Sequence, residues 1–272
     1  MALLWIPGAL LCLAALYLWI IAPSRRRLDA SAFTGRLYAH RGLHDGNHKV
    51  IENSLAAFQR AVEAGYGIEL DVQRTKDGHA VVFHDGDLRR ICGNQRNLCH
   101  LTYEELKAIP LPDGTAIPLF SEVLARVEGK VPLIVEIKHY GGAAQNAALA
   151  LKVLRDYDGP YCMESFHPLA VRHLKRHAPE VLRGQLADGS RWNPNEMGLF
   201  AHLALKHLVV NAVGRPHFVA YSRPEDHTLA IWLMKRVFHP LLAAWTIRDQ
   251  ETLKETHKAY GMLIFEGFSP AD

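Results

Sequence analysis

Short apolar runs alternate with amphipathic segments along most of the chain. The runs have the length of buried strands, and they lie at residues 37–39, 67–72, 80–83, 133–137, 161–163, 182–186, 218–221, 241–245 and 262–265. Apolar residues spaced three or four apart predict helices between most of them, for example at 54–64, 119–127, 144–157, 168–177 and 249–259. This alternation over about 240 residues predicts a parallel α/β fold, and a (β/α)8 barrel of the TIM type has the matching size.

The nine strand candidates exceed the eight places of such a barrel. Residues 262–265, residues 218–221 or a further run such as 208–213 are the ones that could be misassigned. The barrel is predicted to occupy residues 36–270, with a short insertion at 86–117 that begins with a basic stretch.

The N-terminus departs from this pattern. Residues 2–22 carry no charge and are rich in Leu, Ile, Ala and Trp, and a helix of that length would span a hydrocarbon core of about 30 Å. No Lys or Arg precedes the run and its end is a poor cleavage site, which disfavours a secretory signal. Arg25, Arg26 and Arg27 follow at once. Residues 1–27 are therefore predicted to form a membrane anchor with one transmembrane helix and a basic flank, and the flank predicts a single-pass protein whose catalytic domain faces the cytoplasm.

Composition adds one exclusion. The net charge is +3 over 272 residues, and the basic residues are spread along the chain, so no nucleic-acid-binding surface is expected. Nothing in the sequence predicts an oligomeric state.

Polar side chains gather where the strand candidates end. Since the carboxyl ends of barrel strands form the active site in this architecture, these residues are expected to lie together. They are His40, Glu69, Asp71, His84, Glu136 and Lys138.

Glu69 and Asp71 stand two apart in one strand candidate, so their side chains share a face. Two carboxylates on the inner face of an apolar strand repel each other and lose hydration, which requires a cation or other partners. Pairing with Lys and Arg, or an exposed strand, is the alternative. Glu136 brings a third carboxylate from another apolar strand, and oxygen ligands of this kind suit one divalent metal, Mg2+ or Ca2+, rather than Zn2+.

Five ordered motifs carry a resemblance to a known family. They are "AHRG", "IENSLAAFQRAVEAG", "IELDVQRTKDG", "VVFHD" and "VEIK", with "LTYEEL" and "IPLFSEVL" between the last two. In these motifs the chain resembles the glycerophosphodiester phosphodiesterases, whose barrel and general chemistry are similar to those of phosphatidylinositol-specific phospholipases C. The match covers residues 36–186 well and returns at "AAWTIRD".

The resemblance implies roles for individual residues. His40 and His84 match the catalytic histidines, and Glu69, Asp71 and Glu136 match the ligands of the metal. Arg41 and Lys138 match cations that contact the phosphate, and Glu52 and Asn53 match an acidic and amide pair beside the site, although Asn53 is also a candidate helix N-cap. Phe166 and Trp245 follow strand candidates where an apolar wall beside glycerol would be useful, although ordinary core packing is the alternative.

The implied reaction is metal-dependent hydrolysis of a glycerophosphodiester to glycerol 3-phosphate and an alcohol, with the two histidines as acid and base. The nucleophile is either a metal-activated water or the neighbouring glycerol hydroxyl. Two alternatives stay open: lysophospholipase D-like hydrolysis of membrane lysolipids, and a membrane-bound receptor that holds phosphodiesters without turnover. Glu266 and Gly267 stand where the family commonly has Thr and Asp, which leaves the function of the last strand undefined.

Overall fold

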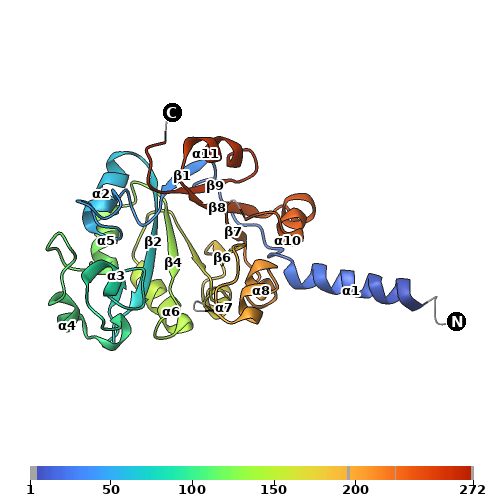
Figure 1. Ribbon diagram of the computed structural model, residues 1–272, viewed down its shortest axis with the longest axis horizontal. Coiled ribbons are helices and arrows are strands. Elements are labelled where there is room, and N and C mark those ends of the chain that lie inside the picture. Colours follow the sequence, from blue (N-terminus) through green and yellow to red (C-terminus); the bar gives the residue numbers. More distant parts are fainter. Residues whose placement is uncertain (1–4, 195–196, 224, 271–272) are drawn as a thin grey trace.

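A closed barrel of eight parallel strands forms the body of the protein. The computed structural model describes residues 5–194, 197–223 and 225–270. The barrel strands are β1 (Arg36–Ala39), β2 (Gly67–Arg74), β4 (Leu133–Ile137), β5 (Tyr161–Ser165), β6 (Arg183–Ala187), β7 (Phe218–Ser222), β8 (Leu241–Ile247) and β9 (Met262–Phe265). The first strand pairs in parallel with both β2 and β9, which closes the sheet on itself (Figure 1). The predicted TIM-type (β/α)8 barrel is confirmed.

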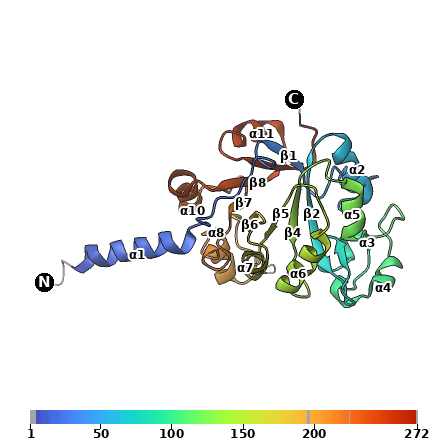
Figure 2. The same ribbon diagram turned by 180° about the vertical axis from the view of Figure 1, so that it is seen from behind.

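Helices cover the outside of the barrel between successive strands (Figures 1 and 2). They are α2 (Leu55–Glu63), α5 (Phe120–Val127), α6 (Ala143–Leu154), α7 (Pro168–His177), α8 (Leu199–Lys206), α9 (Asn211–Gly214), α10 (Leu229–Leu233) and α11 (Gln250–Thr256). Several begin at residues whose side chains accept the first free amides: Ser54 caps α2, Thr228 caps α10 and Asp249 caps α11. A π-helical segment, Met234–Phe238, continues α10.

Two layers of apolar packing hold these elements together. A cluster that includes Tyr38, Ile134 and Phe218 is fully buried, and a larger cluster packs strands against helices. Gly184 shows how closely the first cluster is packed, because a Cβ at this position would lie 2.2 Å from the Phe218 ring. A side chain there would displace that ring from a dense core.

The ninth strand candidate is real but lies outside the parallel set. β3 (Ala80–Val82) turns back from β2 and pairs with it antiparallel, with Val72 opposite Val82. The uncertainty placed on 218–221 and 262–265 was therefore wrong, since both are barrel strands, and residues 211–213 of the 208–213 region belong to α9. A short apolar run does not reveal strand direction, which explains the error.

The segment after β3 has its own small core. Short helices α3 (Arg89–Cys92) and α4 (Tyr103–Lys107) and a 3-10 turn at Leu98–His100 lie between residues 86 and 117. Their apolar side chains pack with strand residues in one buried cluster, which includes Ile51, Phe83, Leu98 and Leu106. This packing fixes the segment beside the end of β3.

The N-terminal prediction requires correction. Helix α1 (Trp5–Ile21) has 17 residues and rises about 26 Å, short of a hydrocarbon core of about 30 Å. Across residues 5–194, 197–223 and 225–270, no helix combines the length and apolar character needed to cross a membrane. The predicted transmembrane anchor, and the single-pass localisation with a cytoplasmic domain derived from it, are wrong.

The physical reason lies at the end of the helix. Pro23 disfavours helical geometry in the residue before it, so α1 ends at Ile21. Ile21 is fully buried against the barrel, and the side chain of Asn211 in α9 donates to its carbonyl at 2.9 Å. The last turn therefore belongs to the globular packing and adds nothing to an exposed apolar length.

Candidate active site

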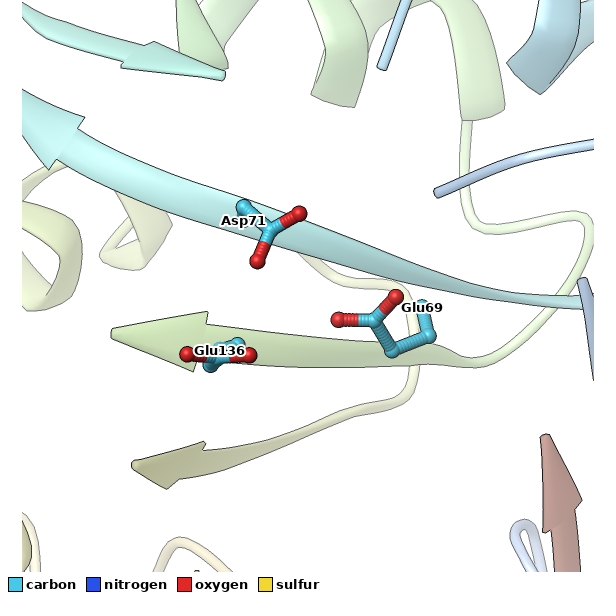
Figure 3. Close-up of side chains that lie close together, drawn as sticks. All are labelled: Glu69, Asp71 and Glu136. Atoms are coloured by element: carbon cyan, nitrogen blue, oxygen red, sulfur yellow. The ribbon is translucent and has the colours of Figure 1, made fainter. Parts of the chain in front are cut away.

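Three carboxylates lie side by side at the carboxyl end of two neighbouring strands. Glu69 and Asp71 come from β2 and Glu136 from β4, with Asp71 directly opposite Glu136 in the parallel register (Figure 3). One ligand oxygen from each residue lies within 4.8 Å of the others. All three are buried, with exposed fractions of 3%, 1% and 8%. The spacing of two along β2 places both acids on the inner face, as predicted.

A fourth acid extends this row. Glu164 in β5 lies opposite Glu136 in the register, is 1% exposed, and its Oε2 has no hydrogen-bond partner among the described residues. Burial, together with repulsion from Glu136 and Asp71, raises the pKa of Glu164 well above its usual value. Our sequence reading ended the strand at Met163 and missed this residue. The signal was present, since Glu164 directly follows an apolar run as Glu136 does.

Two cations face the acids. The Nζ of Lys138 lies 2.8 Å from Glu136 and 3.2 Å from Asp71. Burial opposes the charge on Lys138, but the two carboxylates outweigh it and raise its pKa. Arg41 has a left-handed backbone with φ 55°, and its main-chain amide donates to Glu69 at 3.0 Å. Its guanidinium lies 3.6 Å from Asp71.

The acids in this cluster outnumber the cations. Glu69, Asp71, Glu136 and Glu164 face Lys138 and Arg41, so full ionisation of the four carboxylates would leave two negative charges uncompensated. Burial and repulsion from Asp71 and Glu136 raise the pKa of Glu69 well above its usual value. One divalent cation would match this charge, and the all-oxygen donor set suits Mg2+ or Ca2+. The residues therefore fit the predicted metal. Lys138 and Arg41 also pair with Asp71, so the alternative of pairing with Lys and Arg stays open, whereas burial of all three acids excludes an exposed strand.

Glu52 and Asn53 support the cluster from the loop before α2. The amide of Asn53 donates to Asp71 at 2.8 Å, while Ser54 takes the N-cap position. The capping alternative for Asn53 is thus excluded. Glu52 accepts a hydrogen bond from Arg41 at 2.7 Å and hydrogen bonds from both amino groups of Arg90 at 2.6 and 2.8 Å.

Arg90 comes from the 86–117 segment and was not predicted. Burial opposes ionisation of Glu52, but hydrogen bonds from Arg90 and the charge of Arg41 lower its pKa to about 2. The Nε of Arg90 also donates to Asp85 at 2.7 Å. A basic run in a loop does not indicate which of its residues points inward. The contacts of Arg90 with Glu52 and Asp85 could therefore not be predicted from the sequence.

The two histidines are held by different carboxylates. The Nδ1 of His84 lies 2.6 Å from Asp85, and the Nδ1 of His40 lies 3.3 Å from Glu266. His40 also approaches Glu69, at 3.9 Å from Nε2. Because β3 runs antiparallel, it brings His84 back into the mouth, where the amide of Phe83 donates to the Asp71 carbonyl. The sequence predicts His84 at the end of a parallel strand. It instead follows the antiparallel strand β3, which still brings it close to Asp71.

Glu266 follows the last barrel strand and was singled out only as a departure from the family pattern. It lies 3.3 Å from Nε2 of His44 and 2.7 Å from Arg248. Burial opposes its charge, but His40, His44 and Arg248 outweigh this and lower its pKa. Burial lowers the pKa of His40, while the contact with Glu266 raises it. Glu266 therefore acts on His40 through charge as well as position.

Phe166 and Trp245 lie at the ends of β5 and β8 and contact each other. Their rings are edge to face with centroids 5.6 Å apart, and both pack on the cluster that contains Phe218. The Nε1 of Trp245 is buried and has no acceptor among the described residues. Core packing thus accounts for their apolar faces but not for the indole N–H, which stays available as a hydrogen-bond donor.

A cavity of about 620 Å3 opens beside Asp85, the carboxylate that contacts His84. Its lining includes Asp85, Arg90, Asn97, Cys99 and Tyr140. The 86–117 segment supplies much of this wall. A small ligand has room there.

A barrel with buried acids, two cations and two histidines at the carboxyl ends of its strands is an enzyme of the TIM-barrel class. The sequence model of the Glycerophosphoryl diester phosphodiesterase family matches residues 40–262. The chain belongs to this family, and the prediction that it is a phosphoric diester hydrolase of the glycerophosphodiester phosphodiesterase type is confirmed.

Curated relatives agree with this assignment. The glycerophosphodiester phosphodiesterase of Caldanaerobacter subterraneus is 34% identical over 174 residues, which cover 59% of this chain and 70% of that protein. Glycerophosphodiester phosphodiesterase 1 of Homo sapiens is 31% identical over 159 residues, covering 53% of this chain and 46% of that protein.

Solved structures share the fold. A phosphodiesterase from Oleispira antarctica in complex with the product sn-glycerol-3-phosphate superposes with a TM-score of 0.69 at 22% identity, covering 86% of this chain and 94% of that one. A glycerophosphodiester phosphodiesterase from Parabacteroides distasonis gives 0.67 at 24% identity, with 85% and 92% covered. At these identities the likeness concerns the fold.

Proposed function

We propose that this protein hydrolyses glycerophosphodiesters to glycerol 3-phosphate and an alcohol in a metal-dependent reaction, with residues 36–270 as the catalytic unit. The observation that supports it most is the convergence of Glu69, Asp71 and Glu136 with His40 and His84 at one end of a barrel of this family. The glycerol 3-phosphate complex of the Oleispira antarctica protein supports the choice of product.

Glu69, Asp71 and Glu136 would hold one divalent metal, Mg2+ or Ca2+. When bound, this ion supplies positive charge that offsets the anionic phosphate and the charge that develops in the transition state. The chain itself contributes Lys138 and Arg41 toward the same anion. Their contacts with Asp71 place both cations at the acid cluster.

Proton transfer is assigned to His40 and His84. An oxygen nucleophile, either water or the neighbouring glycerol hydroxyl, loses a proton to one histidine as it forms the new bond to phosphorus. The bond from phosphorus to the alcohol oxygen breaks, and the other histidine gives that oxygen a proton. If the glycerol hydroxyl attacks, the cyclic phosphate is then opened by water with the two roles reversed. Asp85 holds Nδ1 of His84, which leaves Nε2 for the exchange.

The cavity beside Asp85 would receive the alcohol. Asp85, Asp87, Arg89 and Arg90 line it, and this charged lining favours a small polar alcohol over an acyl chain. Phe166 and Trp245 would contact the glycerol side, where the free Nε1 of Trp245 can donate to a hydroxyl. Lysolipids are the competing substrate, and a receptor without turnover is the competing function.

Turnover of glycerophosphocholine and of lysophosphatidylcholine by the purified chain, with excess EDTA and then with Mg2+ or Ca2+ restored, tests this proposal. We expect release of choline from glycerophosphocholine, its loss in EDTA and its return with metal. Glu69→Gln should lose at least about 100-fold in kcat, while Glu63→Gln on the outside of α2 should not. Full activity in EDTA would exclude the metal, faster lysolipid turnover would favour the competing substrate, and binding without turnover would favour the receptor.

A further inference from the structure

A second concentration of charge lies at the opposite end of the barrel. Arg183 begins β6 and His217 directly precedes β7, so both lie at the amino ends of strands whose carboxyl ends form the active site. The two ends are separated by about 15 Å at 3.3 Å per residue. The segment from Pro23 to Leu28, which joins α1 to the barrel, crosses the same end. The amide of Ser24 donates to the Pro216 carbonyl at 2.7 Å and holds it there.

Arg183 is a buried cation without a counter-charge. It is 4% exposed. Its Nε donates to the Gly214 carbonyl at 3.1 Å, its Nη2 donates to the Arg215 carbonyl at 2.7 Å, and its Nη1 lies 3.2 Å from Nε2 of His217. These contacts satisfy its hydrogen bonds but leave its charge unopposed. No carboxylate among the described residues lies within ion-pair distance.

Further cations surround it. Arg26 and Arg27 are exposed on the joining segment, and Arg215 caps α1 by donating to the carbonyls of Ile20 and Ala22. None of the three forms an ion pair with an acid in the described part of the chain. The cluster of Arg26, Arg27, Arg183, Arg215 and His217 is called the foot cluster below.

Burial, and then the like charge of neighbouring cations, lower the pKa values of several of these groups. Burial and the charge of Arg26 lower the pKa of Arg183 to about 10. Burial, Arg183 and Arg26 lower the pKa of His217 to about 4. Lys175 on α7 also has a lowered pKa, through burial and then Arg183 and Arg215. Concentrated charge of one sign that no acid in the described part of the chain pairs with creates a potential that attracts the opposite sign.

The foot cluster also borders a partly open cavity. A cavity of about 130 Å3 is lined by Ser24, Arg26, Arg27 and His217, with Leu28 and Pro240 among the apolar walls. It has the volume of about four waters, enough for a tetrahedral oxyanion. Guanidinium groups match such an anion through paired N–H donors. Neither the position nor the residues overlap with the catalytic site.

We propose that the foot cluster is a binding site for a phosphate-type oxyanion, distinct from the active site. Arg26 and Arg27 contact the anion, His217 lines its cavity, and Arg183 lies behind His217 and adds charge. The anion is either a free phosphate or the phosphate of a lipid headgroup, since the recognition chemistry is the same. Because the end of α1 is fastened to α9 at this point, bound anion also stabilises the junction between α1 and the barrel.

The test compares the full-length protein with two double variants of equal charge. Arg26→Ala/Arg27→Ala removes exposed contacts of the site, and Arg60→Ala/Arg155→Ala removes two exposed arginines on α2 and at the end of α6. Inorganic phosphate is titrated by calorimetry in EDTA, where the acidic active site repels it. Co-sedimentation with phosphatidylcholine vesicles, with and without phosphatidic acid, forms the second arm.

We expect saturable binding that is at least about tenfold weaker in Arg26→Ala/Arg27→Ala and unchanged in the control. Loss in the phosphate arm alone assigns a free anion, and loss that depends on phosphatidic acid assigns a lipid headgroup. Hydrolysis of glycerophosphocholine with metal should be equal in all three proteins. Absence of binding in both arms, or equal binding by both variants, overturns the proposal.

Discussion

At the scale of single residues, His40 and His84 have separate carboxylate partners, and neither can replace the other. General acid and base steps each contribute about 10²–10⁴-fold. His40→Ala and His84→Ala should therefore each lower kcat by that much with little change in KM. Steady-state kinetics measures both, with His79→Ala, exposed and outside the site, as the control. A variant that keeps wild-type kcat removes that histidine from the mechanism.

Glu266 allows a sharper prediction, because its charge favours the protonated form of His40. In Glu266→Gln the pKa of His40 should fall further, since burial lowers it and the opposing carboxylate is gone. The limb of the kcat/KM profile that belongs to His40 should move to lower pH. Glu180→Gln, exposed on the loop before β6, is the control. An unchanged profile in Glu266→Gln would show that Glu266 does not act on His40.

Most of the candidate site could be predicted from the sequence because its residues follow apolar strands in order. Glu69 and Asp71 share a face by strand geometry alone, and Glu136 follows from the same rule. Glu164 obeys the rule too but was missed, because its strand was ended two residues early. Arg90 and Asp85 act through a loop fold, and no spacing rule reports how a loop turns.

At the scale of elements, the return strand β3 and helix α1 show the limits of pattern reading. Periodicity gives the existence of β3 but not its direction, which depends on the tight turn after β2. The apolar composition of α1 suggested a span. The length of the exposed apolar helix is set by Pro23 and by the burial of Ile21 against the barrel. Burial depends on the tertiary structure, so the sequence pattern does not report it.

Asp226 links three segments in the C-terminal part of the barrel. It accepts hydrogen bonds from Lys235 at 2.7 Å and Tyr260 at 2.7 Å, and it pairs with Arg223. The three partners come from the π-helical segment, the region before β9 and the end of β7. Burial opposes its charge, but these partners outweigh it and lower its pKa to about 2.

Since the folded pKa lies below the unfolded value of about 3.9, ionised Asp226 stabilises the fold above that value. The contribution is lost as pH falls from about 4 to about 2. Asp226→Asn should cost about 1–3 kcal/mol at neutral pH and flatten the pH dependence in that window. Urea unfolding at several pH values measures this, with Asp156→Asn as the exposed control. A parallel loss of stability at every pH would contradict the assigned cause.

At the scale of the whole molecule, charge is separated along the barrel axis. Acids dominate the carboxyl ends of the strands and unpaired arginines dominate the amino ends. On the proposed function, the acidic end would need a bound cation to hold an anionic phosphodiester, and activity would then depend on a divalent ion. The arrangement thus links the metal, the substrate and the two histidines in one account.

The central claim is that the site breaks the bond between phosphorus and the alcohol oxygen and leaves phosphate on glycerol. 31P NMR of glycerophosphocholine incubated with the full-length protein and Mg2+ or Ca2+ distinguishes the two possible cleavages in one spectrum. The account predicts that the glycerol 3-phosphate resonance appears, either directly or after a cyclic phosphate intermediate. In EDTA the substrate resonance should stay unchanged. Appearance of phosphocholine, or an unaltered substrate resonance with either metal, would contradict it.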